Sequence, residues 1–171
     1  MADTTFRRAG REDLGGILAL LADDDLGRDR ESLADEDLPD YRAAFEAIDR
    51  DPNQLLAVAA DGPDIFGCMQ ITFIPGLARR GAWRGQIEAV RVAPSRRGDG
   101  LGARFLAWAV EQCRARGCRL VQLTSDKQRD RAHDFYRVQG FEASHVGFKL
   151  DLSVPPRPAG PRRSPPAHSE G

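Results

Sequence analysis

Apolar residues recur every three or four positions in four segments of the chain, which is the spacing of a helix with one buried face. The predicted helices cover residues 11–21, 38–50, 102–116 and 131–138. The stripe in the third segment is the clearest, because its charged residues fall outside the apolar face. Gly117 and Gly140 follow the last two segments and are placed to end them.

Strand-like runs, rich in branched and aromatic residues, alternate with these helices. The predicted strands cover residues 6–9, 55–60, 65–74, 86–93 and 120–124, with a last strand from Phe141 onward. We expect the three middle strands to form an antiparallel meander. The strand 86–93, the helix after it and the strand 120–124 form a βαβ unit with a right-handed, parallel crossover. The sequence thus predicts a mixed α/β (α+β) sheet, antiparallel first and parallel later.

The composition is that of one soluble folded domain. The chain has 171 residues, of which 41% are hydrophobic and 30% charged, and no apolar run approaches the ~18 residues that span a bilayer. No signal-peptide pattern stands at the start, so we expect a cytoplasmic protein with no membrane contact. Residues 153–171 contain six prolines and no periodicity, which predicts a disordered tail after a domain at 1–152.

Charge and cysteine content limit the classes of ligand and partner that we expect. The net charge of -1 gives no signature of nucleic-acid binding. Residues 1–50, however, hold fourteen Asp and Glu against seven Arg, and such a segment at a substrate mouth would favour a cationic amine, with Asp24 and Asp25 as candidates. The alternative is that these charges belong to solvated helix ends and a loop, as most charge runs do. Three cysteines without a C-x-x-C pair suggest no zinc site or disulfide framework, and Cys68 and Cys113 are expected in the core.

One turn has the features of a phosphate site. The sequence Arg97-Gly98-Asp99-Gly100-Leu101-Gly102, here called the glycine turn, follows a strand and opens a helix, so backbone N–H groups and the positive helix end converge there. We expect it to bind a phosphate-bearing cofactor. A dinucleotide-binding fingerprint also fits loosely, from Gly98 to Ala103, but such folds place it after the first strand and need more βα units than the remaining chain provides.

Three segments in this order resemble the GNAT superfamily of acetyltransferases: residues 87–94, the glycine turn, and Ala132 to Tyr136 followed by Gly140-Phe141. The resemblance covers nearly all of residues 6–152. Within the superfamily, the chain is similar to aminoalkylphosphonate acetyltransferases and to small bacterial members. It implies acetyl-CoA as co-substrate and transfer of its acetyl group to a primary amine, of a small molecule, by direct attack in a ternary complex. It leaves open a homodimer, a protein amine as acceptor, and a non-catalytic acetyl-CoA sensor.

The resemblance also implies roles for single residues. The cofactor set comprises Val90, Arg91, Val92, Arg97, Gly98, Asp99, Gly100, Leu101, Gly102 and Arg129. Within it the Val92 N–H is expected to meet the thioester carbonyl. Glu88 matches the general base and Tyr136 the acid that protonates the departing thiolate. The alternatives are a glutamate paired with Arg84 or Arg91, and a tyrosine that only packs.

Two further expectations concern the acceptor and metals. Many family members carry asparagine where this chain has Arg129, so the contact to pantetheine is in doubt there, although arginine could reach a phosphate or the substrate. Tyr41 and Trp83 are weak candidates for lining the acceptor pocket, together with Asp24 and Asp25. Isolated histidines such as His133 and His145 are typical of surfaces, so no metal site is predicted.

Overall fold

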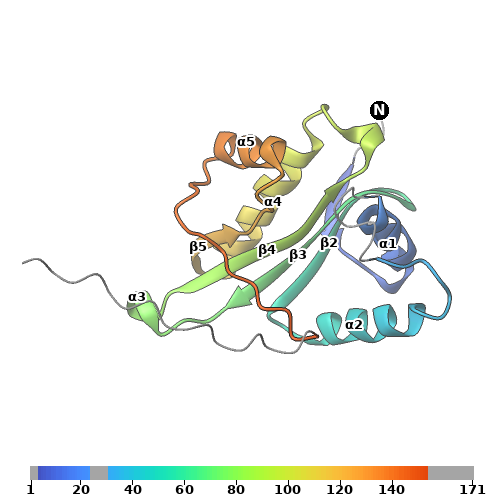
Figure 1. The fold of residues 1–171 in the computed structure, drawn as a ribbon, viewed down its shortest axis with the longest axis horizontal. Helices are drawn as coiled ribbons and strands as arrows, with labels where there is room; N and C mark the ends of the chain where they lie inside the picture. Colours follow the sequence, from blue (N-terminus) through green and yellow to red (C-terminus); the bar gives the residue numbers. More distant parts are fainter. Residues whose placement is uncertain (1–3, 24–30, 154–171) are drawn as a thin grey trace, which may run out of the picture.

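One five-stranded sheet, in the order β1-β2-β3-β4-β5, organises the computed structural model, which describes residues 4–23 and 31–153 (Figure 1). The strands are β1 (Thr5–Arg8), β2 (Gln54–Asp61), β3 (Asp64–Ile74), β4 (Trp83–Val92) and β5 (Cys118–Leu123). The first four are antiparallel neighbours, and β5 runs parallel to β4. The predicted mixed sheet, with its early meander and late parallel pair, is confirmed.

Helices cover both faces of this sheet. The helices are α1 (Leu14–Ala22), which follows the 3-10 turn η1 (Arg11–Asp13), then α2 (Leu38–Arg50), α3 (Ala78–Gly81), α4 (Leu101–Ala115), which follows η2 (Pro94–Arg96), and α5 (Asp130–Val138). Figure 1 shows α4 on one side of the sheet and α1 with α2 on the other. None of these helices in the described ranges is long and apolar enough to cross a membrane.

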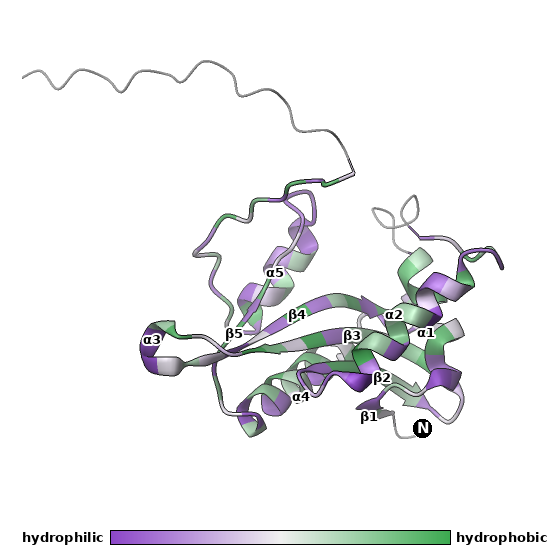
Figure 2. Cartoon of the chain, turned by 90° about the horizontal axis from the view of Figure 1, so that it is seen from below, coloured by the Kyte–Doolittle hydropathy of each residue, from purple (hydrophilic) through white to green (hydrophobic). Residues whose placement is uncertain are grey.

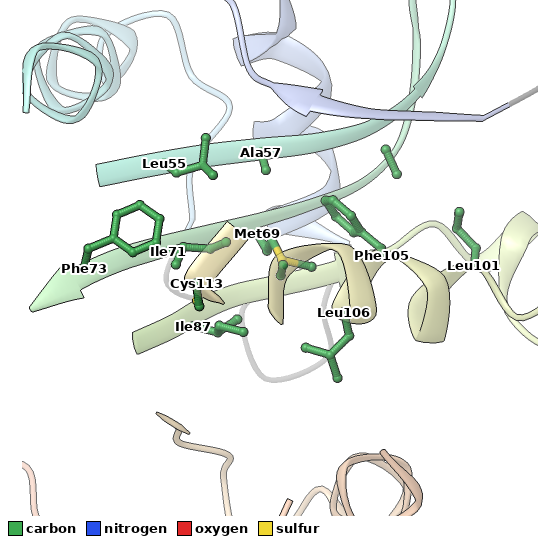
Figure 3. Close-up of a cluster of buried hydrophobic side chains, with 12 residues drawn as sticks. Leu55, Ala57, Met69, Ile71, Phe73, Ile87, Leu101, Phe105, Leu106 and Cys113 are labelled. Atoms are coloured by element: carbon green, nitrogen blue, oxygen red, sulfur yellow. The ribbon is translucent and has the colours of Figure 1, made fainter. Parts of the chain in front are cut away.

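The run 55–60 explains why both faces are covered. Leu55, Ala57 and Ala59 point to the α4 side, where they join one buried cluster, whereas Leu56, Val58 and Ala60 join a second cluster under α1 and α2. A strand with two buried faces needs no polar alternation, which accounts for the continuous apolar run. Figure 3 shows the α4-side cluster, in which Phe105 and Leu106 meet Met69 and Ile71.

The expected cysteine positions are confirmed, because Cys68 and Cys113 are buried and unbridged. The predicted last strand is wrong. After α5 the described residues contain no strand, and the chain from Phe141 to Asp151 has no regular secondary structure. The physical reason is that a strand needs a backbone partner, and β5 pairs only with β4 in the described part of the chain. The predicted tail at 153–171 lies almost wholly outside the described residues.

Candidate active site

The parallel strands β4 and β5 stop pairing before β4 ends. Their last paired residues are Ile87 and Leu123, and β4 continues alone on this side to Val92. We call this point the fork. Between two paired strands every inward N–H and C=O is used by the ladder, so an unpaired stretch is where a strand can offer backbone groups to a ligand.

A bulge re-aims β4 at the fork. Ala89 has φ +53, in the left-handed region, and the register with β3 shifts there, so that two residues of β4 oppose Met69. The extra residue in such a bulge reverses the face of the sheet to which the following side chains point. As a result Val90 and Val92 pack on the α4-side core, whereas Glu88 before the bulge is exposed.

The backbone of Val92 faces away from β3. The next residue, Ala93, donates its N–H to the Phe66 carbonyl on β3 at 2.8 Å. Because successive N–H groups of a strand point in opposite directions, the Val92 N–H is directed to the β5 side, into the fork. The carbonyls on this side accept from guanidinium groups, Val90 from Arg91 at 2.9 Å and Val92 from Arg97 at 3.0 Å.

The glycine turn connects β4 to α4 through two left-handed glycines. Gly98 has φ +87 and Gly100, the N-cap of α4, has φ +80, a conformation that side chains rarely adopt. Between them, the Asp99 carboxylate accepts from the Leu101 N–H at 3.0 Å and from Arg96 at 2.8 Å, and the Arg96 hydrogen bond lowers the pKa of Asp99. The Leu101 side chain is fully buried, so it anchors the turn to the core.

Gly102 brings the turn, the end of β4 and α5 together. A β-carbon at this position would lie 3.7 Å from Phe135 Cζ on α5 and 3.7 Å from Val92 Cγ2 on β4. Both are ordinary contact distances. The first turn of α4 therefore lies between the end of β4 and the Phe135 ring. The sequence did not single out Phe135, although it directly precedes Tyr136.

Aromatic packing holds the Tyr136 ring on α5. Its ring lies 5.3 Å from that of Phe135 and 5.9 Å from that of Phe141, both edge-on. Burial raises the pKa of the Tyr136 phenol, and the positive charges of Arg91 and Arg129 act on it in the opposite sense. The phenol thus keeps its proton at neutral pH, within the influence of two arginines that belong to the predicted cofactor set.

Two of the other candidates, Trp83 and Tyr41, make contacts outside the fork. Trp83 starts β4, opposite Cys118, and its ring packs under Arg116 at 5.6 Å, so it is at the far end of the strand from the fork. Tyr41 on α2 donates to Glu31 at 2.9 Å and accepts from the Ser32 N–H at 3.1 Å, which ties down the chain before that helix. Asp24 and Asp25 lie outside the described residues.

Two histidines of the described residues make local contacts. His133 bonds the Asp126 carbonyl at 2.8 Å, and His145 bonds the Ser144 hydroxyl at 2.8 Å. Within residues 4–23 and 31–153 no three His, Cys, Asp or Glu side chains gather in a group that could hold a metal ion.

The geometry fits a long phosphate-bearing thioester. The glycine turn supplies left-handed glycines and a helix start for phosphates, and the fork supplies a directed N–H within a strand that lacks its neighbour. Phe135 lies where the two meet, and the Tyr136 ring packs against Phe135. These residues come from β4, α4 and α5, and only the Ala89 bulge lacked any signal in the sequence, because alanine is rarely left-handed.

Comparisons with known proteins agree with this geometry. Residues 19–141 match the model of the acetyltransferase (GNAT) family. That range contains the fork, the glycine turn and Tyr136.

Two curated proteins are similar in sequence. An aminoalkylphosphonate N-acetyltransferase of Salmonella typhimurium is 32% identical over 148 residues, which cover 86% of this chain and 90% of that protein. A glucosamine 6-phosphate N-acetyltransferase of Trypanosoma brucei brucei is 36% identical over 88 residues, covering 52% of this chain and 58% of that one. Among solved structures, a transcriptional regulator from Bacillus halodurans is 44% identical with a TM-score of 0.85, covering 88% of this chain and 100% of that chain.

Proposed function

The chain belongs to the acetyltransferase (GNAT) family and is an acetyl-CoA-dependent N-acetyltransferase, and on this premise we propose that it acetylates the primary amine of a small molecule by direct attack in a ternary complex. The observation that supports the proposal is that the glycine turn adjoins the fork at Gly102, where the Val92 N–H is directed away from β3, and that Tyr136 lies within reach of the Arg91 charge.

Binding of the coenzyme is assigned to backbone groups. The glycine turn, Arg97 to Gly102, would hold the pyrophosphate through N–H groups and the positive end of α4. The pantetheine would lie along residues 90–92, where β4 lacks a neighbour on the β5 side. The Arg97 guanidinium is close by, since it already bonds Val92 O, and Arg129 stands near Tyr136.

The proposed chemistry needs two proton transfers. The acceptor must lose a proton before its nitrogen can form a bond to the thioester carbon, and Glu88 would take that proton, directly or through a water. The Val92 N–H would stabilise the negative charge on the carbonyl oxygen. As the carbon–sulfur bond breaks, the Tyr136 phenol would donate its proton to the sulfur, which makes the leaving group a neutral thiol.

The names of the two curated relatives guide the choice of acceptors. One acts on aminoalkylphosphonates and the other on glucosamine 6-phosphate, so both proteins take an amine that also carries an anionic phosphorus group. Arg91 and Arg129, whose positive charges act on Tyr136, are of the residue type that binds such a group. An amine panel should therefore begin with aminoalkylphosphonates and amino-sugar phosphates, each beside its uncharged analogue.

The test combines turnover with coenzyme binding. We expect Glu88→Gln and Tyr136→Phe each to lower kcat by roughly 10²-fold, the typical contribution of an acid–base group, while calorimetry shows acetyl-CoA affinity close to that of the wild type. Tyr41→Phe is the matched control, because it removes the same hydroxyl from a tyrosine that bonds Glu31 and Ser32, and it should leave kcat unchanged. Full turnover in both site variants would remove Glu88 and Tyr136 from the mechanism.

A second candidate is a non-catalytic sensor of acetyl-CoA. It is favoured by the description of the 44% identical structure as a transcriptional regulator. The two functions separate in the same experiment, because a sensor binds acetyl-CoA but releases no free thiol with any amine of the panel.

A further inference from the structure

A hollow of about 420 Å³ lies on the α4 side of the sheet, at the end of the sheet away from the fork. Its lining comes from the ends of four elements, β1, β2, β3 and α4, and from the chain that leads into β2. Figure 3 shows two of its lining residues, Leu55 and Phe73, at one end of the buried cluster, and Leu101, which opens α4, at the other. A hollow of this volume is large enough for a small molecule.

The packing of α4 explains why the core does not fill this space. Figure 2 shows α4 along one face of the sheet, with α1 and α2 on the other. The helix packs mainly over β3, β4 and β5. Its last turn approaches β4 closely, because a β-carbon at Gly85 would lie only 2.4 Å from Cys113 Sγ. The end of α4 is thus held over β4, and the space above the neighbouring strand ends stays open.

The floor of the hollow is apolar and aromatic. Leu55 and Phe73 are each 7% exposed and belong to the core beneath it. Trp108 of α4 also lines the hollow, and its ring stacks on Phe105 at 6.0 Å and tilts against Phe6 at 6.3 Å. These core rings hold the indole in place. The hollow therefore has two fixed aromatic side chains, which is the kind of surface that a flat apolar ring prefers.

Arg116 brings a positive charge to this floor. Its guanidinium lies 5.7 Å from the centre of the Phe73 ring. It donates only to neutral acceptors, the Asn53 side-chain carbonyl at 3.0 Å and the Pro52 backbone carbonyl at 3.3 Å, and it pairs with no carboxylate among the described residues. These bonds fix the position of the guanidinium and leave its charge uncompensated.

Arg8 brings a second positive charge to the same face. It stands opposite Ala57, whose side chain belongs to the α4-side cluster, and opposed residues share a face. Arg8 donates to the Gln54 carbonyl at 3.1 Å and lies 3.8 Å from the Asp49 carboxylate. Both side chains of that ion pair are about half exposed, so the pair is weak and leaves Arg8 able to bind another anion. In the part of the chain that the structure describes, no acidic side chain lines the hollow.

We propose that this hollow is a second ligand site, separate from the site of acetyl transfer, and that it takes a small aryl carboxylate. The ring of the ligand would lie against Trp108 and Phe73. Its carboxylate would accept hydrogen bonds from Arg8 and Arg116, because a planar guanidinium matches the two oxygens of a carboxylate. An amine would meet two like charges here, so the hollow is not a second pocket for the acceptor.

The distance to the glycine turn keeps the two sites apart. α4 extends for 15 residues from that turn to the hollow, or about 20 Å along its axis. Acetyl-CoA bound at the glycine turn and along residues 90–92 would therefore not overlap with a ligand in the hollow. Binding of the two should be independent.

Tryptophan fluorescence can measure binding, because Trp108 lines the hollow and the other tryptophan, Trp83, lies under Arg116. The probe is phenylacetate, and we expect a saturable change with a Kd on the order of 1 mM or lower. Phenylacetamide and phenethylamine keep the ring but lose or reverse the charge, and they should bind at least about tenfold more weakly. Saturating acetyl-CoA should leave the Kd of phenylacetate unchanged.

Three substitutions locate the bound probe. Ala115→Phe fills the hollow from an exposed helical position, so the variant should fold and lose the binding. Arg116→Gln should raise the Kd at least about tenfold. The control, Arg114→Gln, removes the same charge from an arginine that pairs with Glu111 outside the hollow, and should bind as the wild type does.

Four results would each overturn the site: no saturation with phenylacetate, equal affinity for phenylacetamide, undiminished binding in Ala115→Phe, or competition by acetyl-CoA. The last would place the probe in the site of acetyl transfer. These results leave the proposed acetyltransferase activity untouched, because its residues do not line the hollow.

Discussion

Asp13 is the buried charged side chain of the described residues, at 4% exposure. Its carboxylate accepts two hydrogen bonds from the Arg7 guanidinium, at 2.5 and 2.9 Å, and one from the Gly10 N–H at 2.7 Å. The Arg7 hydrogen bond holds the pKa of Asp13 below its ordinary value, against the effect of burial, which would raise it. The joint between β1 and α1 thus depends on an ionised carboxylate.

Removing that charge should therefore destabilise the fold in a pH-dependent way. We expect Asp13→Asn to lower the free energy of unfolding by about 1–3 kcal/mol at neutral pH, a range kept modest because Arg7 is 38% exposed. A group whose folded pKa is depressed stabilises above its unfolded pKa and loses that stabilisation as pH falls through the folded pKa. The difference from wild type should shrink below about pH 4.

Urea unfolding at neutral and at acidic pH measures this difference. Asp64→Asn at the exposed start of β3 is the control, since it removes the same charge without a buried partner and should have little effect at either pH. A difference for Asp13→Asn that stays constant down to about pH 3 would mean that the carboxylate charge is not what stabilises this joint.

At the scale of the element, α4 and the glycine turn can be probed at Gly102. Gly100 is unsuitable, because its φ of +80 makes any side chain strain the backbone. A methyl group at Gly102 meets only ordinary contacts with Phe135 and Val92, so Gly102→Ala should fold. The same methyl narrows the space where the turn meets the fork, and acetyl-CoA affinity should fall about tenfold.

Thermal unfolding with and without acetyl-CoA measures this loss of affinity. At a hundredfold excess over its dissociation constant, acetyl-CoA should stabilise the wild type by about 2.7 kcal/mol, or roughly 5–10 °C in Tm. At that concentration the shift for Gly102→Ala should drop by about half. Gly15→Ala in α1, where a β-carbon meets nothing within 4 Å, should keep the whole shift. An undiminished shift in Gly102→Ala would move the coenzyme away from this helix start.

Elements were predictable where the signal is local. The 3.6-residue stripes placed α2 at 38–50 as predicted, and the apolar runs found β2 and β3 to within a residue or two. The last strand failed because pairing is not local: Phe148, Leu150 and Leu152 have the right alternation, but whether a strand forms depends on which edge meets them. The bulge at Ala89 was invisible, since tertiary packing rather than residue type imposes its positive φ.

Site residues divide along the same line. The glycine turn and Tyr136 could be proposed from the sequence because their motif spacing reflects backbone geometry, and in the structure Gly102 of the turn lies beside Phe135, the neighbour of Tyr136. Trp83 was a guess about which aromatic residues line a pocket, and its place under Arg116 depends on the packing of α4 against the start of β4. Side-chain partners of this kind follow from the folded arrangement and leave little trace in sequence.

For the whole molecule, the relevant feature is an uneven charge distribution along a nearly neutral chain. Residues 1–50 carry a net charge of -7, so the remainder carries +6. Three arginines lie in or near the glycine turn: Arg97 is its first residue, Arg96 bonds Asp99, and the charge of Arg104 also acts on Asp99. The coenzyme, which bears several negative charges on its phosphates, would thus approach the positive part of the protein, and an amine the negative part.

Salt should therefore lower the affinity for acetyl-CoA more than it lowers the affinity for an uncharged ligand. Between about 0.02 and 0.5 M salt the Debye length falls from about 20 Å to a few ångströms, so affinity should decline steadily, and Arg97→Ala should both weaken binding at low salt and flatten the decline. Arg116→Ala, which removes the same charge at the Trp83 end of β4, is the control and should parallel the wild type. Calorimetric titrations across this salt range measure the effect. If affinity falls equally steeply with salt in Arg97→Ala and in the wild type, the phosphates bind away from the glycine turn.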